Sequence, residues 1–147
     1  MAALIQATAP EDVDRVRALF AEYARAVNAP QCFVGLDREL AALPAGYFVL
    51  LLASESAGCV GVRRLDAGTA EMKRLYVRPA YRGHGLGRRL AEAAIAAARR
   101  QGCRRIVLDS LPGMREARSL YRLLGFEEIP SYSEAPTPGA TCFELRF

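Results

Sequence analysis

The 147-residue sequence has one histidine, one lysine and no apolar stretch long enough to cross a membrane. A membrane-spanning helix needs about 20 apolar residues, whereas the longest run, Tyr47–Ala53, has the length of a buried strand. The four cysteines lack metal-ligand spacing such as CxxC. We therefore expect neither a metal site nor disulfides. The first residues lack the features of a signal peptide, which predicts a cytoplasmic protein.

The composition is that of a soluble globular protein, with 52% hydrophobic and 24% charged residues. The length fits one domain with a sizeable core. No internal repeat or low-complexity linker divides the chain. We expect a single domain over residues 1–147.

Positive charge is concentrated in the middle of the chain. Residues 63–105 hold twelve Lys or Arg against three Asp or Glu, a net +9, while residues 1–62 sum to −3 and residues 106–147 to −2. Such a region suggests an anionic ligand, although arginines on a solvated face need no partner. Nucleic acid is a competing partner, but only Tyr76 and Tyr81 could stack on bases there. We expect neither a nucleic acid nor a membrane partner.

Hydrophobic periodicity and turn residues predict a mixed α/β fold around one central sheet. A capping box of Thr8 and Glu11 should open the first helix, which stops near Asn28. Short loops favour antiparallel pairing of the second, third and fourth strands, and an intervening helix makes the fifth parallel to the fourth. Strands are expected at Ala3–Ala7, Tyr47–Ser54, Cys59–Leu65, Ala70–Val77, Arg104–Ser110, Phe126–Ile129 and Thr141–Phe147, and further helices at Leu36–Leu43, Leu86–Gln101 and Ala117–Leu124.

The segment Arg82–Gly87, RGHGLG, lies where a strand should turn into a helix. Free amides and the dipole at a helix start favour an anion such as phosphate. The first turn carries Arg88 and Arg89 where acids would be favoured, which fits a bound pyrophosphate. A dinucleotide fingerprint fails because Arg88 or Leu90 occupies its third glycine position, and a P-loop fails because Lys73 is the only lysine. A glycine-rich turn without a ligand is the alternative.

The loop fits a different pattern, [QR]xxGxG. The stretch EMKRLYVRPAYRGHGLGRRLAEAAIAAAR, Glu71–Arg99, resembles the acetyl-CoA-binding motif of the GNAT superfamily of N-acetyltransferases, and ARSLYRLLGFEEI, Ala117–Ile129, resembles its C-terminal LYxxxGF motif. The resemblance implies a GNAT-like mixed central sheet, with antiparallel N-terminal strands, a parallel β-α-β acetyl-CoA unit and flanking helices. It also implies acetyl transfer from acetyl-CoA to a primary amine by direct attack in a ternary complex.

In similar proteins the strand before the glycine loop carries a bulge and splays from the next parallel strand, and acetyl-CoA enters the gap. The resemblance implies that strand backbone pairs with the pantetheine arm, that an N–H near Tyr76 polarises the thioester carbonyl, and that loop amides cradle the pyrophosphate. Arg88 or Arg89 could help to bind the 3′-phosphate. The implied binding residues are Leu75, Tyr76, Val77, Arg82, Gly83, His84, Gly85, Leu86, Gly87 and Arg88. One departure from the family is Met114, where members commonly have an asparagine that contacts CoA.

The resemblance makes Tyr121 the general acid that protonates the leaving thiolate. A tyrosine pKa of about 10, above the thiol value of about 8.5, keeps Tyr121 protonated at neutral pH. Glu71 is the candidate base, directly or through water. The alternatives are a core tyrosine at 121 and a solvent-exposed strand residue at 71. We expect His84, at a variable loop position, to have no catalytic role.

The acceptor in similar proteins lies across the first two helices and the last hairpin, which here contain Tyr23, Phe33, Glu39, Tyr132 and Glu134. Small amines, amino acids, antibiotics and protein N-termini or lysines all stay open. So do a non-catalytic acyl-CoA-binding or regulatory module, transfer of a different acyl group, and a homodimer formed through exposed edge strands.

Overall fold

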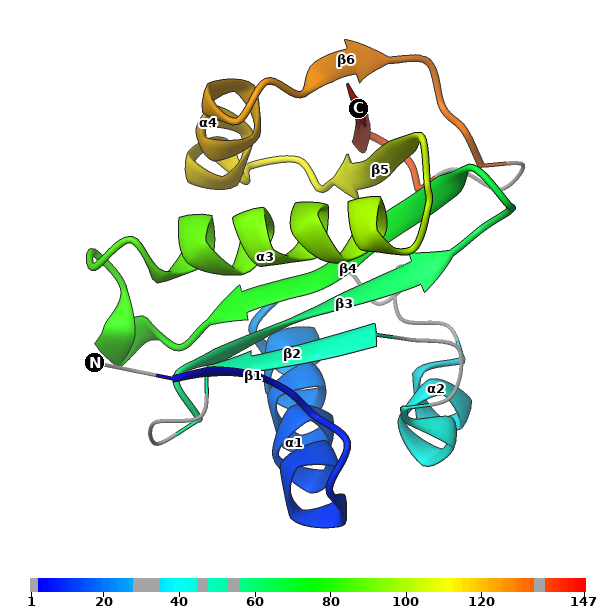
Figure 1. Cartoon of the computed structure of the whole chain (residues 1–147). Helices are drawn as coiled ribbons and strands as arrows, with labels where there is room; N and C mark the ends of the chain where they lie inside the picture. Colours follow the sequence, from blue (N-terminus) through cyan, green and yellow to red (C-terminus); the bar gives the residue numbers. More distant parts are fainter. Residues whose placement is uncertain (1–2, 28–34, 45–47, 53–55, 134–136) are drawn as a thin grey trace.

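The computed structural model describes residues 3–27, 35–44, 48–52, 56–133 and 137–147 (Figure 1). The elements follow the predicted order and differ from the predicted bounds by a few residues at most. They are β1 (Leu4–Gln6), α1 (Pro10–Ala26), α2 (Leu36–Ala42), β2 (Phe48–Leu52), β3 (Gly58–Arg64), β4 (Thr69–Val77), the short 3₁₀ helix η3 (Pro79–Tyr81), α3 (Leu86–Arg100), β5 (Arg105–Ser110), α4 (Arg115–Leu123), β6 (Glu127–Ile129) and β7 (Thr141–Arg146).

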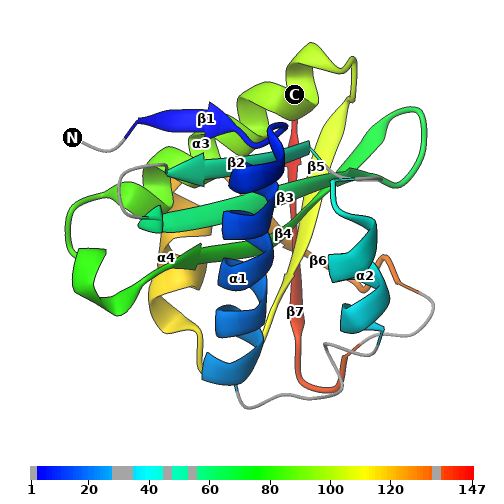
Figure 2. The same ribbon diagram turned by 90° about the horizontal axis from the view of Figure 1, so that it is seen from below.

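The strands form one seven-stranded sheet in the order β1-β2-β3-β4-β5-β7-β6. Among the described strands, β4 and β5 alone pair in parallel, and every other neighbouring pair is antiparallel. Helix α3 provides the crossover between these two parallel strands, as a parallel connection requires. Helices α3 and α4 cover one face of the sheet, and α1 and α2 lie on the other (Figures 1 and 2). The predicted mixed sheet is therefore confirmed.

Two apolar clusters fill the two faces. The larger one packs the alanine-rich face of α3 on the sheet, and the smaller one packs α1 on it. On β4, Ala70 and Met72 belong to the α3 side, whereas Tyr76 belongs to the α1 side. Side chains at even spacing along a regular strand share a face, so an irregularity must lie between Met72 and Tyr76.

That irregularity is a β-bulge. Cys59 pairs with Tyr76 and Gly61 with Lys73, so a step of two residues on β3 matches a step of three on β4. Arg74 lies inside the step with φ of 57°, in the left-handed region. Its buried guanidinium donates to the Glu39 carboxylate at 3.2 and 2.8 Å. Since α2 buries none of its own residues, this ion pair is one of the contacts that hold α2 to the sheet.

β4 and β5 pair over only three residues each. The last pair joins Glu71 to Val107, although β4 runs on to Val77 and β5 to Ser110. Beyond Glu71 the two strands therefore separate, and the edge of β4 that faces β5 is left without a strand partner. The gap between the separated strands is called the wedge below, and it lies at the end of the sheet where α3 begins (Figure 1).

The predicted capping box is wrong. Helix α1 starts with Pro10, its N-cap residue is Ala9, and no side chain caps it. The Ala9 carbonyl accepts from the amides of Asp12 and Val13 at 3.0 and 2.9 Å. A proline at the first helical position has no amide to satisfy, which moves the cap one residue past Thr8. The helix ends at Ala26 with Val27 as its C-cap residue, which agrees with the predicted stop near Asn28.

Cys59, Cys103 and Cys142 are buried free thiols, in accord with the expectation for these three cysteines. Within the described ranges, no group of three or more potential ligands is placed to hold a metal ion. No helix in this part of the chain combines the length and apolar character that a membrane crossing requires.

Gly58 is required for close backbone approach. A Cβ added there would lie 2.5 Å from the carbonyl oxygen of Tyr76 on β4. A Cβ on Gly68 would make only ordinary contacts, with the side chains of Arg104 at 3.8 Å and Asp66 at 3.9 Å. We expect Gly58→Ala to destabilise the fold by about 1–3 kcal/mol and Gly68→Ala to be nearly neutral. Urea unfolding of both variants measures this, and equal midpoints would contradict it.

Candidate active site

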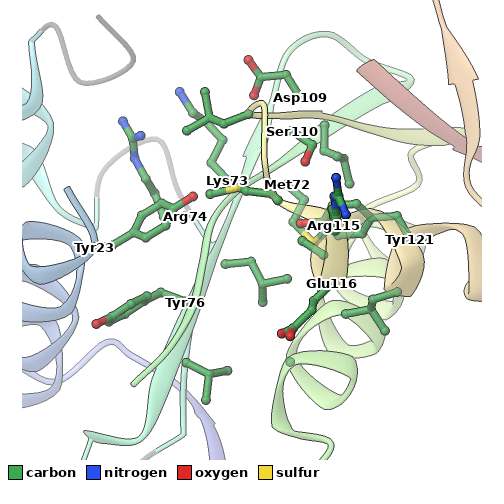
Figure 3. Close-up of a pocket in the computed structure, with 18 of the residues that line it drawn as sticks. Tyr23, Met72, Lys73, Arg74, Tyr76, Asp109, Ser110, Arg115, Glu116 and Tyr121 are labelled. Atoms are coloured by element: carbon green, nitrogen blue, oxygen red, sulfur yellow. The ribbon is translucent and has the colours of Figure 1, made fainter. Parts of the chain in front are cut away.

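The wedge between β4 and β5 opens into a cleft of about 750 Å³. Its walls are β4 from Glu71 onward, the glycine loop, the end of β5 with the start of α4, and parts of α1 and of the loop before β7 (Figure 3). The cleft therefore collects residues from opposite ends of the sequence. Its shape follows from the early end of the β4–β5 pairing.

Most of the residues singled out in the sequence line this cleft. Glu71 and Tyr121 are among them, as are eight of the ten predicted binding residues: Leu75, Tyr76, Val77, Arg82, Gly83, Gly85, Leu86 and Gly87. The other two, His84 and Arg88, belong to the loop and to the first turn of α3 without lining the cleft. The structure thus brings the proposed donor-binding segments and both proposed catalytic side chains to one place.

The glycine loop presents unused backbone donors. Gly83 and Gly85 have φ of 85° and 73°, and an added Cβ would meet nothing within 4 Å at either, so conformation rather than space requires glycine there. Gly85 is the N-cap of α3, with no side-chain cap and no acid in the first turn. Within the described residues, no amide from 83 to 88 donates a hydrogen bond. This helix start can accept an anion.

Two arginines beside the loop already have contacts. Arg82 donates from Nε to the Val77 carbonyl at 2.9 Å, which ties the loop to the end of β4. Arg88 Nε lies 2.8 Å from Glu92 Oε1, and both side chains are more than half exposed. An exposed pair at this helical spacing contributes only about 0.3–0.5 kcal/mol, so a phosphate could displace Glu92 at little cost. The role of Arg88 stays a prediction.

Tyr121 reaches the cleft from α4. Its side chain is 7% exposed, and its ring packs against Phe126 and Phe143. The hydroxyl makes no hydrogen bond to any described residue. Burial, with the nearby Tyr23 and Asp109, raises the pKa of Tyr121 above its usual value. The phenol therefore stays protonated at neutral pH and is available as a donor.

Glu71 is buried on the cleft wall, and both carboxylate oxygens accept hydrogen bonds. Arg63 Nη2 donates to Oε1 at 2.7 Å, and the Tyr132 hydroxyl donates to Oε2 at 2.6 Å. The carboxylate in turn helps burial to raise the pKa of Tyr132. These two partners hold Glu71 in place and occupy both of its carboxylate oxygens. Glu71 as the base stays a prediction.

Asp109, which the sequence analysis missed, offers a second carboxylate. It lies near the end of β5 and lines the cleft. Apart from a hydrogen bond from its own backbone amide, its carboxylate has no hydrogen bond or ion pair with any residue the structure describes. Desolvation and repulsion from Glu71 raise its pKa, even though its side chain is exposed at the cleft mouth. Its position was a usable signal, since ligands of open α/β sheets bind at the carboxyl ends of parallel strands.

The remaining candidate residues do not all line the cleft. Tyr23 and Tyr132 line the cleft, Glu39 pairs with Arg74, and Phe33 and Glu134 lie outside the described residues. Met114 lines the cleft as the N-cap residue of α4. Ser110, also on the cleft wall, has a buried hydroxyl oxygen with no partner in the described part of the chain.

Known proteins are similar to this chain both in sequence and in fold. The acetyltransferase (GNAT) family model matches residues 13–126. An uncharacterized N-acetyltransferase of Schizosaccharomyces pombe is 33% identical over 145 residues, which cover 92% of this chain and 89% of that protein. A crystal structure from Klebsiella pneumoniae, provisionally described as an acyl-CoA N-acyltransferase, is 28% identical with a TM-score of 0.79 and covers 99% of this chain and 97% of its own.

A GNAT family acetyltransferase from Elizabethkingia anophelis, solved with acetyl-CoA bound, shares the fold at 18% identity and a TM-score of 0.68, covering 99% of this chain and 97% of that one. From the family match and the curated relative together, the chain belongs to the GNAT acetyltransferase family. The resemblance read from the two motifs is confirmed, and with it the class of acyltransferase.

Proposed function

We propose that this protein transfers an acetyl group from acetyl-CoA to a primary amine by direct attack within a ternary complex. The observation that carries the proposal is the meeting, in one cleft, of the β4 edge that has no β5 partner, the free amides of the glycine loop and the Tyr121 hydroxyl. The fold neighbour from Elizabethkingia anophelis, which binds acetyl-CoA, supports the choice of donor.

The residues present fit this donor. The amides of residues 83–88 supply donors for a pyrophosphate, and the backbone of Leu75–Val77, which has no β5 partner, can pair with an extended pantetheine arm. The unpartnered Ser110 hydroxyl adds a polar group on the opposite wall. The proposed binding residues are Leu75, Tyr76, Val77, Arg82, Gly83, His84, Gly85, Leu86, Gly87 and Arg88.

Acetyl-CoA supplies the acyl group in activated form, as a thioester. An amide of the β4 end near Tyr76 provides a fixed dipole for the carbonyl oxygen. The amine nitrogen forms the new bond to the carbonyl carbon as the carbon–sulfur bond breaks. Tyr121 Oη gives its proton to the departing sulfur, and a carboxylate of the cleft takes the proton from the amine.

We propose Asp109 as that carboxylate. No other described residue donates a hydrogen bond to its oxygens, whereas Arg63 and Tyr132 occupy those of Glu71. Asp109 also lies close enough to Tyr121 for its charge to help raise the tyrosine pKa. The proposed proton donor and the proposed proton acceptor therefore lie in the same part of the cleft. Glu71, acting through water, is the second candidate.

The donor site is tested at Gly87. A Cβ there meets only Leu120 and Val77, at 3.9 and 4.0 Å, so side chains can be placed without disturbing the fold. We expect calorimetry to show acetyl-CoA binding weakened at least about tenfold in Gly87→Glu, because the new anion meets the pyrophosphate. Gly87→Gln should weaken it less and Gly87→Ala least. Equal binding by Glu and Gln variants would contradict a pyrophosphate at this helix start.

Tyr121→Phe tests the acid, because it removes only the hydroxyl. With the best acceptor from an amine screen, we expect kcat to fall by about 10²–10⁴ and the Kd for acetyl-CoA to stay unchanged. Unchanged kcat would remove Tyr121 from the reaction. A wild-type protein that binds acetyl-CoA but acetylates no amine would instead be an acyl-CoA-binding module.

The base is tested by pH. An aspartate acts as a base only when ionised, so kcat/KM should decrease as the pH falls through the pKa of Asp109, which lies above the usual value. In Asp109→Asn the decrease at this pKa should disappear, and only the decrease that follows the free-amine fraction should remain. Glu71→Gln is the comparison, and loss of the limb in that variant alone would make Glu71 the base.

A further inference from the structure

We propose that the acceptor is a compact zwitterion, such as an amino acid, whose carboxylate binds Lys73 and whose amine lies at Asp109. This inference rests on the proposed acetyl transfer and names its acceptor class. It starts from two opposite charges that line one cleft without contacting each other. Figure 3 shows both side chains extending toward the same end of that cleft.

Neither the Lys73 ammonium nor the Asp109 carboxylate has an ion pair or hydrogen bond with another residue of the described ranges. Their charged neighbours are paired: Arg63 with Glu71 at 2.7 Å, and Arg74 with Glu39 at 2.8 Å. Lys73 and Asp109 therefore keep their charges available for a ligand at the β4–β5 wall of the cleft.

The backbone explains why these two are left over. Glu71 and Val107 form the last β4–β5 pair, and two residues further along each strand come Lys73 and Asp109. In a continuing ladder these side chains would be cross-strand neighbours and would form an ion pair. The separation of the strands keeps them apart, and a ligand with both charges can bridge the gap.

Desolvation disfavours the charged form of both groups. Desolvation lowers the pKa of Lys73 and raises the pKa of Asp109, while the lysine charge partly opposes the rise at Asp109. A ligand carboxylate at Lys73 and a ligand ammonium at Asp109 would compensate both charges at once. An amine without a carboxylate would compensate only Asp109.

The surrounding charges also favour a ligand without net charge. Lys73 is influenced by Glu71, Arg74, Arg63 and Glu39, and Asp109 by Glu71, Lys73 and Arg74. Counting these groups with Asp109 gives three cations and three anions, so the site is balanced overall. A polyamine would bring excess positive charge next to three cations, whereas a zwitterion keeps the balance.

The test compares amino acids, their α-carboxamides and the matching decarboxylated amines as acceptors, by release of the CoA thiol. A charge-assisted hydrogen bond contributes about 1.5–3 kcal/mol, so kcat/KM should be about 10–100-fold higher for the amino acid than for its amide. Lys73→Met should abolish this preference mainly through KM, and Lys73→Arg should keep part of it. Arg100→Met, which removes one exposed charge at the far end of α3, is the matched control.

Binding is measured in parallel, by calorimetry of the amino acids against the protein alone and with CoA. Loss of their binding in Lys73→Met supports the proposal whatever the donor proves to be. The proposal is overturned if the wild-type protein has the same kcat/KM for the carboxamides or the decarboxylated amines as for the amino acids. A Lys73→Met variant that lowers kcat/KM equally for all three sets also overturns it, as does the absence of amino-acid binding and turnover altogether. Failure of acetyl-CoA to bind would overturn the proposed transfer, and the amino-acid titrations would still decide the acceptor site.

Discussion

The active-site region depends on one extra residue in β4. A non-glycine residue in the left-handed region costs roughly 1–2 kcal/mol, and Arg74 adopts that conformation inside the sheet. Its guanidinium is buried against the Glu39 carboxylate, and the Cys59 thiol contacts its carbonyl oxygen at 3.7 Å. The surrounding structure thus holds a backbone geometry that an isolated strand would not keep. The bulge also turns Tyr76 to the α1 face.

The separation of β4 from β5 beyond Glu71 has three consequences at the same place. It leaves a strand edge that an extended ligand can use, it lets the Tyr121 hydroxyl reach the cleft from α4, and it keeps Lys73 and Asp109 apart. Because β4 leads through η3 into the glycine loop, the start of α3 lies at the end of that open edge. One change in strand pairing therefore brings together the groups that we propose for binding and for chemistry.

The sequence predicts what local patterns determine. Hydrophobic periodicity gave the order of elements, and the glycine loop and LYxxxGF motif located most of the cleft wall. Contacts between distant residues were not predictable in this way. The Tyr132–Glu71 hydrogen bond spans 61 positions, and the significance of Asp109 depends on a pairing register that stops two residues earlier. The i,i+4 spacing of Arg88 and Glu92 is typical of a helical ion pair, although Arg88 was expected to contact an anion.

Folding brings acidic residues next to the basic residues that are concentrated in residues 63–105. Acids from the flanking segments neutralise part of this positive charge, as in Arg74–Glu39, Arg78–Glu22 and Arg105–Glu144. These pairs all use arginine, whose planar fork suits a fixed carboxylate. The only lysine among the 20 basic residues stands unpaired, among described residues, in the cleft. A compact ammonium on a flexible stem can follow a carboxylate that arrives and leaves, which is the requirement for a turnover ligand rather than for a structural pair.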